Sequence, residues 1–99
     1  MQDSTCGHWE LVLHVETKKL VRGLHLDELV RIRETLRSLR KMALNDLDIK
    51  KLEGWRDSHN RDIFRVRVGR DIRILVSFDP ENRQVHVWKI ARRESVYDG

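Results

Sequence analysis

The strongest constraint on the fold is a stretch, residues 63–97, in which apolar and polar side chains alternate. Phe64, Val66 and Val68 share one parity, and after Gly69 the run 72–78 places isoleucine, valine and phenylalanine on alternate positions. Successive side chains of a strand point to opposite faces, so each run can give one face to a core. Turn-forming residues at 68–71 and 79–82 separate the runs. The pattern predicts three consecutive antiparallel strands.

Arginines occupy alternate positions in the first two runs. If the valines and isoleucines face the core, Arg65, Arg67 and Arg73 must share the opposite, exposed face. These arginines are either ordinary solvent-facing residues paired with nearby acids, or an anion site, because the guanidinium fork matches phosphate oxygens. Both interpretations fit the alternation alone.

The remainder of the chain predicts a strand, then one or two helices. Residues 9–15 read as a strand, 16–23 as a short helical turn and 26–43 as a helix with one apolar stripe. The other face of this helix is basic, which fits a solvated surface, a nucleic-acid surface or a docking face for an acidic segment. Residues 45–53 read as a connector and 56–62 as a polar loop. The order predicts an α+β domain with helices on one face of a mostly antiparallel sheet.

Composition narrows the class of protein. The 99 residues predict one domain at 9–97, with a flexible leader at 1–8 and a tail at 98–99. A net charge of +4 favours anionic partners. The single cysteine, Cys6, excludes an internal disulfide, and five histidines without ligand spacing predict no metal or other cofactor. With no apolar run of membrane-spanning length and no secretory signal, we expect a cytoplasmic protein without membrane contact.

Four motifs together resemble the RelE/ParE toxin superfamily of type II toxin–antitoxin systems. They are Lys-Lys-Leu-x-Gly at 50–54, Phe-Arg-Val-Arg-Val-Gly at 64–69, Asp-Ile-Arg-Ile-Leu-Val at 71–76 and Arg-Arg-Glu-Ser-Val-Tyr at 92–97. The resemblance covers residues 9–97 and favours the RelE-like branch. It implies a β-α-(α)-β-β-β order with a curved sheet.

The RelE-like branch implies a ribosome-dependent endoribonuclease, an mRNA interferase that inhibits translation by cutting mRNA in the ribosomal A site. In that chemistry the 2′-hydroxyl attacks the adjacent phosphate without a metal, leaving a 2′,3′-cyclic phosphate. The resemblance implies a catalytic set of Arg65, Arg67, Arg73, Arg93 and Tyr97. It implies further RNA-binding positions at Lys50, Lys51, Arg70 and Arg92.

The sequence departs from the family at the residue for proton transfer. Arg92-Arg93 stands where the family usually has His-Arg, and arginine does not deprotonate in proteins. The available candidates for proton transfer are Lys51, His59, His86, Glu94 and Tyr97.

The resemblance also implies partners and alternatives. The expected partner is an acidic, partly disordered antitoxin, through which alone the protein would contact operator DNA. A ParE-like toxin that inhibits DNA gyrase by binding, and a catalytically degenerate member acting as a binding module, remain alternatives.

Overall fold

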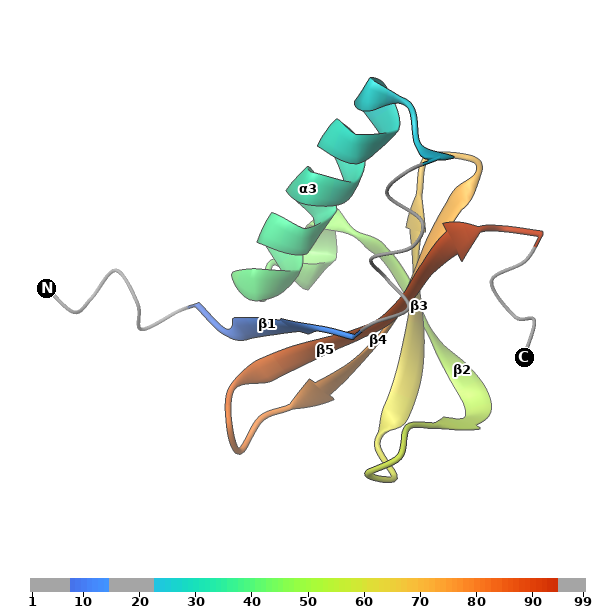
Figure 1. Ribbon diagram of the computed structural model, residues 1–99. Coiled ribbons are helices and arrows are strands. Elements are labelled where there is room, and N and C mark those ends of the chain that lie inside the picture. Colours follow the sequence, from blue (N-terminus) through green and yellow to red (C-terminus); the bar gives the residue numbers. More distant parts are fainter. Residues whose placement is uncertain (1–7, 15–22, 95–99) are drawn as a thin grey trace, which may run out of the picture.

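The computed structural model describes residues 8–14 and 23–94. Most of the predicted leader at 1–8 and of the turn at 16–23, the tail at 98–99, and Tyr97 lie outside these residues. Figure 1 shows one helix packed against a twisted sheet. The elements are β1 (Glu10–Leu13), α3 (Leu26–Arg40), a 3₁₀ turn η2 (Leu44–Asp46), β2 (Asp48–Arg56), β3 (Asp62–Val68), β4 (Ile72–Asp79) and β5 (Gln84–Arg92). The predicted α+β class is confirmed.

The five strands form one sheet in the order β1-β5-β4-β3-β2. Strands β3, β4 and β5 form the predicted antiparallel meander. β2 adds antiparallel to β3 at one edge, and β1 adds parallel to β5 at the other. The first strand of the chain therefore depends on the last strand for its hydrogen bonds.

The prediction of a connector at 45–53 is wrong, because residues 48–56 form β2. Along this edge strand only Ile49 and Leu52 are even half buried, and the other side chains are exposed. Charged residues are typical of edge strands, where they discourage pairing with other chains. A register shift and the positive φ of Gly54 interrupt the strand further. With so few buried positions, β2 lacks the alternation by which strands are recognised in a sequence.

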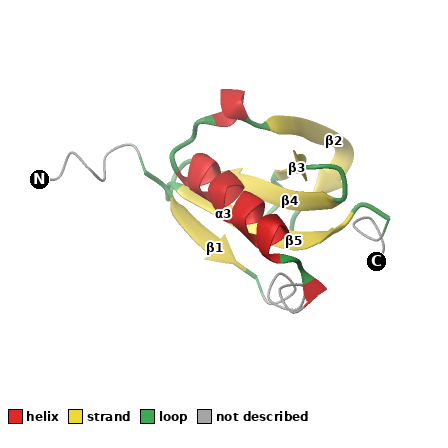
Figure 2. Ribbon diagram, turned by 90° about the horizontal axis from the view of Figure 1, so that it is seen from above, coloured by secondary structure: helices red, strands yellow, loops and turns green. Residues whose placement is uncertain are grey.

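Helix α3 covers one face of the sheet, as Figure 2 shows. Its Ile32 and Leu39 are buried in one cluster with the even-numbered apolar residues of β3 and β4 and with Val85, Val87 and Ile90 of β5. The backbone N–H of His25 donates to Glu28 at 3.1 Å, which closes the N-terminal turn. The helix ends at Arg40 rather than at 43, because Met42 adopts φ +58° and turns the chain toward η2.

In the described part of the chain, no helix is both long and apolar enough to cross a membrane.

Candidate functional site: an arginine-lined cavity

Strand register places the predicted arginines on the sheet face opposite α3, here named the open face. Arg67 of β3 lies directly across from Arg73 of β4, while Arg65 lies across from Leu75. The neighbouring Val66 and Ile74 are fully buried under the helix, so the odd-numbered side chains must point the other way. Like charges directly opposite each other destabilise a sheet. The Arg67–Arg73 pair is therefore a placement that strand pairing alone does not favour.

A cavity of about 560 Å³ opens between these arginines and the β3–β4 turn. Its lining residues are Arg67, Gly69, Arg70, Asp71, Arg73 and Arg93. The backbone N–H of Arg93 donates to the Asp71 carbonyl at 2.7 Å, which fixes the end of β5 against the turn. Four arginines from four segments thus converge on one hollow, where guanidinium groups can hold the oxygens of a phosphodiester.

Arg73 has the expected face but not the expected exposure. Only 8% of the residue is exposed, and its Nη1 donates to the carbonyls of Arg70 at 3.1 Å and Ile72 at 2.9 Å. The expectation of an exposed Arg73 is therefore wrong. The guanidinium folds back onto the β3–β4 turn and supports its backbone, so this arginine combines a structural contact with its position in the cavity.

The structure separates the other predicted RNA-binding residues. Lys50 lies across from Arg65 on the open face. Lys51 has the opposite parity and lies 3.9 Å from the carboxylate of Asp62. Arg92 is on the helix side, where its guanidinium bonds Glu28 at 2.9 and 3.2 Å. That contact lowers the pKa of Glu28 and raises the pKa of Arg92. Arg70 and Lys50 thus accompany the open-face arginines, and Lys51 and Arg92 do not.

The open face also carries a carboxylate that the sequence analysis missed. Asp48, the first residue of β2, approaches Arg65 Nη2 at 3.4 Å with one oxygen and Arg67 Nη1 at 3.6 Å with the other. Because residues 45–53 carry no clear alternation, their strand was not recognised. The shared parity of Asp48 with Lys50 was the signal that could have found it.

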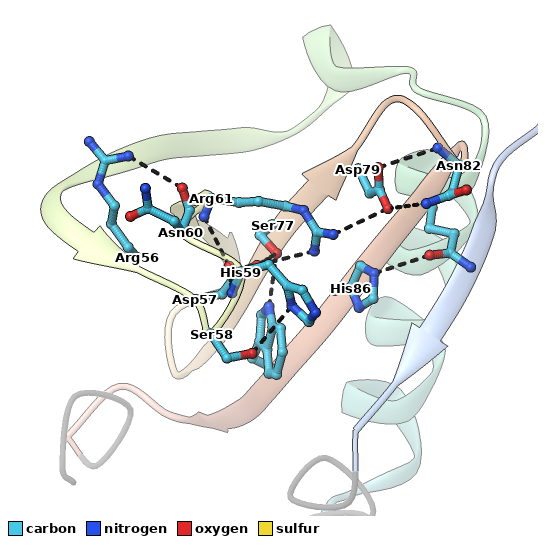
Figure 3. A network of polar contacts seen from close by, with 12 residues as sticks. Arg56, Asp57, Ser58, His59, Asn60, Arg61, Ser77, Asp79, Asn82 and His86 are labelled. Atoms are coloured by element: carbon cyan, nitrogen blue, oxygen red, sulfur yellow. Dashed lines mark hydrogen bonds and ion pairs between the residues drawn. The ribbon is translucent and has the colours of Figure 1, made fainter.

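A separate polar network occupies the opposite end of the open face (Figure 3). Asp57 accepts a hydrogen bond from the Ser77 hydroxyl at 2.6 Å and from the backbone N–H groups of His59 and Arg61 at 2.8 and 2.9 Å. Arg61 also contacts Asp79 at 3.2 Å. Burial alone would raise the pKa of Asp57, but these hydrogen bonds outweigh it and leave the pKa below its ordinary value. The network ties the loop between β2 and β3 to β4.

The two histidines considered for proton transfer lie near this network rather than at the cavity. His86 lies across from Ser77 of β4, and Arg73 precedes Ser77 by four residues on the same strand. At about 3.3 Å per residue that separation is roughly 13 Å. His86 contacts His14 at 3.1 Å and Gln84 at 3.2 Å, and His59 contacts Ser58. Of the candidates within the described residues, only Glu94 adjoins a cavity residue, Arg93, in sequence.

Metal ligands do not assemble anywhere in residues 8–14 and 23–94: these contain no group of three or more histidine, cysteine, aspartate or glutamate side chains placed to hold an ion.

Comparison with solved structures finds the same overall fold in proteins of toxin–antitoxin complexes. A chain of the archaeal RelE–RelB complex from Pyrococcus horikoshii OT3 aligns with a TM-score of 0.71 and 24% identity, over 87% of this chain and 96% of its own. The fold is that of the RelE toxins. The RelB–RelE antitoxin–toxin complex of Methanococcus jannaschii gives a TM-score of 0.68 at 20% identity, over 88% and 95% of the two chains. The RelBE2 toxin–antitoxin complex of Mycobacterium tuberculosis gives 0.65 at 20%, over 87% and 99%.

No family model and no curated protein sequence matches the chain. The assignment of a RelE-like fold therefore rests on the structural alignments, which cover nearly the whole length of each protein compared.

Proposed function

We propose that this RelE-like protein is the toxin of a type II toxin–antitoxin pair and cleaves mRNA in the ribosomal A site. The observation that supports this most is the cavity of about 560 Å³ in which four arginines meet. An anion-binding hollow on the sheet face opposite α3 suits a substrate whose backbone carries a charge at every nucleotide. No metal is required, because arginines can stabilise the additional charge of the transition state.

In the proposed reaction the 2′-hydroxyl of one nucleotide attacks the adjacent phosphorus and the 5′-oxygen of the next nucleotide leaves. Arg67 and Arg93 are exposed at the cavity and would hold the non-bridging oxygens. Arg73 is held by two backbone carbonyls and would present a fixed positive charge from the cavity floor. Charge fixed before the reaction needs no rearrangement as the transition state forms, which favours catalysis.

The test is primer extension on mRNA in a purified translation system, with Arg67→Ala and Arg93→Ala beside the wild type. We expect breaks within A-site codons in the wild type, reduced at least about a hundredfold in both variants, because each removes a donor to the transition state. Arg56→Ala is the matched control, since Arg56 is an exposed arginine that pairs with Asp62 away from the cavity.

Absence of breaks from folded wild-type protein would contradict the nuclease. A DNA supercoiling assay with gyrase would then decide between the ParE-like alternative, which predicts inhibition, and a degenerate binding module, which predicts none.

We propose further that the antitoxin docks along the flank of α3 that faces β1. A groove of about 330 Å³ there has an apolar floor and an arginine rim, lined by Leu11, Leu29, Ile32, Arg33, Leu36, Arg37 and Arg40. Leu26 and Val30 remain exposed along the same helix. An amphipathic segment with apolar anchors and acidic flanks complements both the floor and the rim. The solved RelE-like proteins named above were crystallised as complexes with their antitoxins.

Co-expression with the product of the neighbouring gene tests the docking surface. Arg33→Glu combined with Arg37→Glu should abolish co-purification of an acidic partner, because two attractive contacts become repulsive. Arg31→Glu is the control on the same helix, since Arg31 lies over Gly69 on the side away from β1. Equal loss of the partner in both variants would contradict this location.

A further inference from the structure

We propose that Asp48 is an internal counterion for Arg65 and Arg67, which an RNA phosphate must displace in order to bind. The inference rests on the proposed function, because it names a residue that tunes the affinity of the same site. Asp48 would thereby set how tightly, and with what salt dependence, the open face holds RNA.

The geometry of Asp48 imitates that of a bound phosphate. One carboxylate oxygen faces Arg65 Nη2 and the other faces Arg67 Nη1, so a single anion bridges two guanidinium groups. The β2–β3 register sets this arrangement, because Asp48 lies across from Arg67. Arg67 also lines the arginine cavity, so Asp48 stands at the margin of the proposed substrate site.

The contacts of Asp48 are loose enough to be exchanged. Their N–O distances of 3.4 and 3.6 Å exceed the roughly 2.7–2.9 Å of strong charge-assisted hydrogen bonds. The Asp48 side chain is 54% exposed, so it can turn into water without opening the core. A phosphate that approaches more closely would gain the contacts that the carboxylate makes poorly.

Arg65 explains why an anion is needed at this place. Its side chain is only 14% exposed, and its Nε is buried without a hydrogen-bond partner. A guanidinium so far removed from water is costly when no anion accompanies it. Asp48 supplies that anion in the free protein, and the phosphate would supply it in the complex.

An internal counterion has a measurable consequence for salt dependence. A phosphate that binds an arginine releases cations condensed around the RNA, and the affinity then falls with salt by a logarithmic slope of about 0.7 per contact for single strands. While Asp48 competes for the two guanidinium groups, these phosphate contacts form less completely and release fewer cations. Removal of Asp48 should therefore strengthen binding and steepen the salt dependence together.

The experiment compares Asp48→Asn with Asp62→Asn. Both substitutions remove one negative charge from a carboxylate that holds two basic side chains, but Asp62 holds Lys51 and Arg56, away from the cavity. The probe is a fluorescein-labelled single-stranded RNA with 2′-O-methyl groups, which cannot be cleaved. Its affinity is measured by fluorescence anisotropy at several salt concentrations.

We expect Asp48→Asn to bind about three- to tenfold more tightly than the wild type, the effect of losing two competing ion pairs. The logarithmic salt slope should steepen by about 0.7–1.4, whereas Asp62→Asn should change the affinity by less than about twofold. Equal effects of the two substitutions would overturn the proposal. Weaker binding by Asp48→Asn would overturn it as well and make Asp48 a positioning residue.

Two further measurements separate this inference from the proposed function. Retention on a heparin column measures how strongly the arginines bind a polyanion, whether or not RNA is the natural ligand. Asp48→Asn should elute at higher salt than Asp62→Asn. Cleavage of unmodified mRNA on ribosomes measures the proposed nuclease activity alone. Thermal melting verifies that each variant is folded, with Asp48→Ser as a second, smaller substitution.

Discussion

Arg73 shows how one side chain can serve both the backbone and a binding site. A guanidinium has five N–H donors, and two hydrogen bonds from Arg73 Nη1 hold the carbonyls of Arg70 and Ile72. The same residue also lines the cavity. A substitution here therefore changes stability as well as activity.

We expect Arg73→Ala to lower the free energy of unfolding by about 1–3 kcal/mol, because it removes one buried and one partly buried hydrogen bond to backbone carbonyls. Urea denaturation measures this effect. Arg67→Ala, in the same cavity but exposed, should change stability by less than about 0.5 kcal/mol. An unchanged unfolding midpoint for Arg73→Ala would show that the backbone contacts contribute nothing.

His86 predicts a pH dependence of stability. Only 9% of His86 is exposed, and this burial lowers the pKa of its imidazole. The nearby charges of Arg61 and His14 lower the pKa further. Asp57 and Asp79 face the same ring and oppose this shift without reversing it. A histidine with a lowered pKa binds its proton more readily in the unfolded chain than in the folded one.

Stability from His86 is therefore present above the ordinary histidine pKa of about 6.5 and is lost as the pH falls through it. Denaturation curves between pH 8 and pH 5 should show this decline, and His86→Gln should flatten it. A decline of the same size in His86→Gln would assign the effect to other groups.

At the scale of the elements, the sequence predicted those strands and helices whose apolar residues recur at regular spacing. The alternation along β3 and β4 correctly assigned every arginine of these strands to its face, because side-chain parity follows directly from strand geometry. It could not reveal β2, whose side chains are mostly exposed, nor the burial of Arg73, which depends on a turn folding back. The parallel pairing of β1 with β5 was equally hidden, since no local pattern specifies a partner so distant in the chain.

The β3–β4 turn offers a test of how tightly the cavity is built. Gly69 has φ +62°, and a Cβ at this position would lie 3.0 Å from Arg31 Nη1. We expect Gly69→Ala to cost about 1–2 kcal/mol, because an L-residue is strained in this conformation. Gly23→Ala is the control, since nothing lies within 4 Å of its added Cβ. Thermal melting of both variants that coincides with the wild type would contradict the strain.

The molecule as a whole divides its surface between the two sides of the sheet. The open face presents the arginine cavity, and the flank of α3 beside β1 presents an apolar groove with a basic rim. Two anionic partners could therefore be bound at separate places. This division follows from one helix covering one face, while on the other face a small cluster of Ile63, Leu75 and Ala91 leaves the arginine end accessible.

RNA affinity should fall steeply with ionic strength. Lys50, Arg70 and Arg93 offer about three phosphate contacts for which Asp48 does not compete, which predicts a logarithmic slope of about −2 for single-stranded RNA bound to the wild type. Anisotropy titrations over a range of salt concentrations measure it. A slope near zero would exclude the open face as the binding surface.

The parallel pairing of β1 with β5 has a consequence for biosynthesis. Glu10 and Gln84, which are 74 positions apart, share a side-chain hydrogen bond at this junction. A nascent chain emerges from its amino end, so β1 must wait for β5 before it can join the sheet. Pairings of such long range also form slowly. A protein proposed to attack ribosomes would thus remain incomplete until β5 has been synthesised.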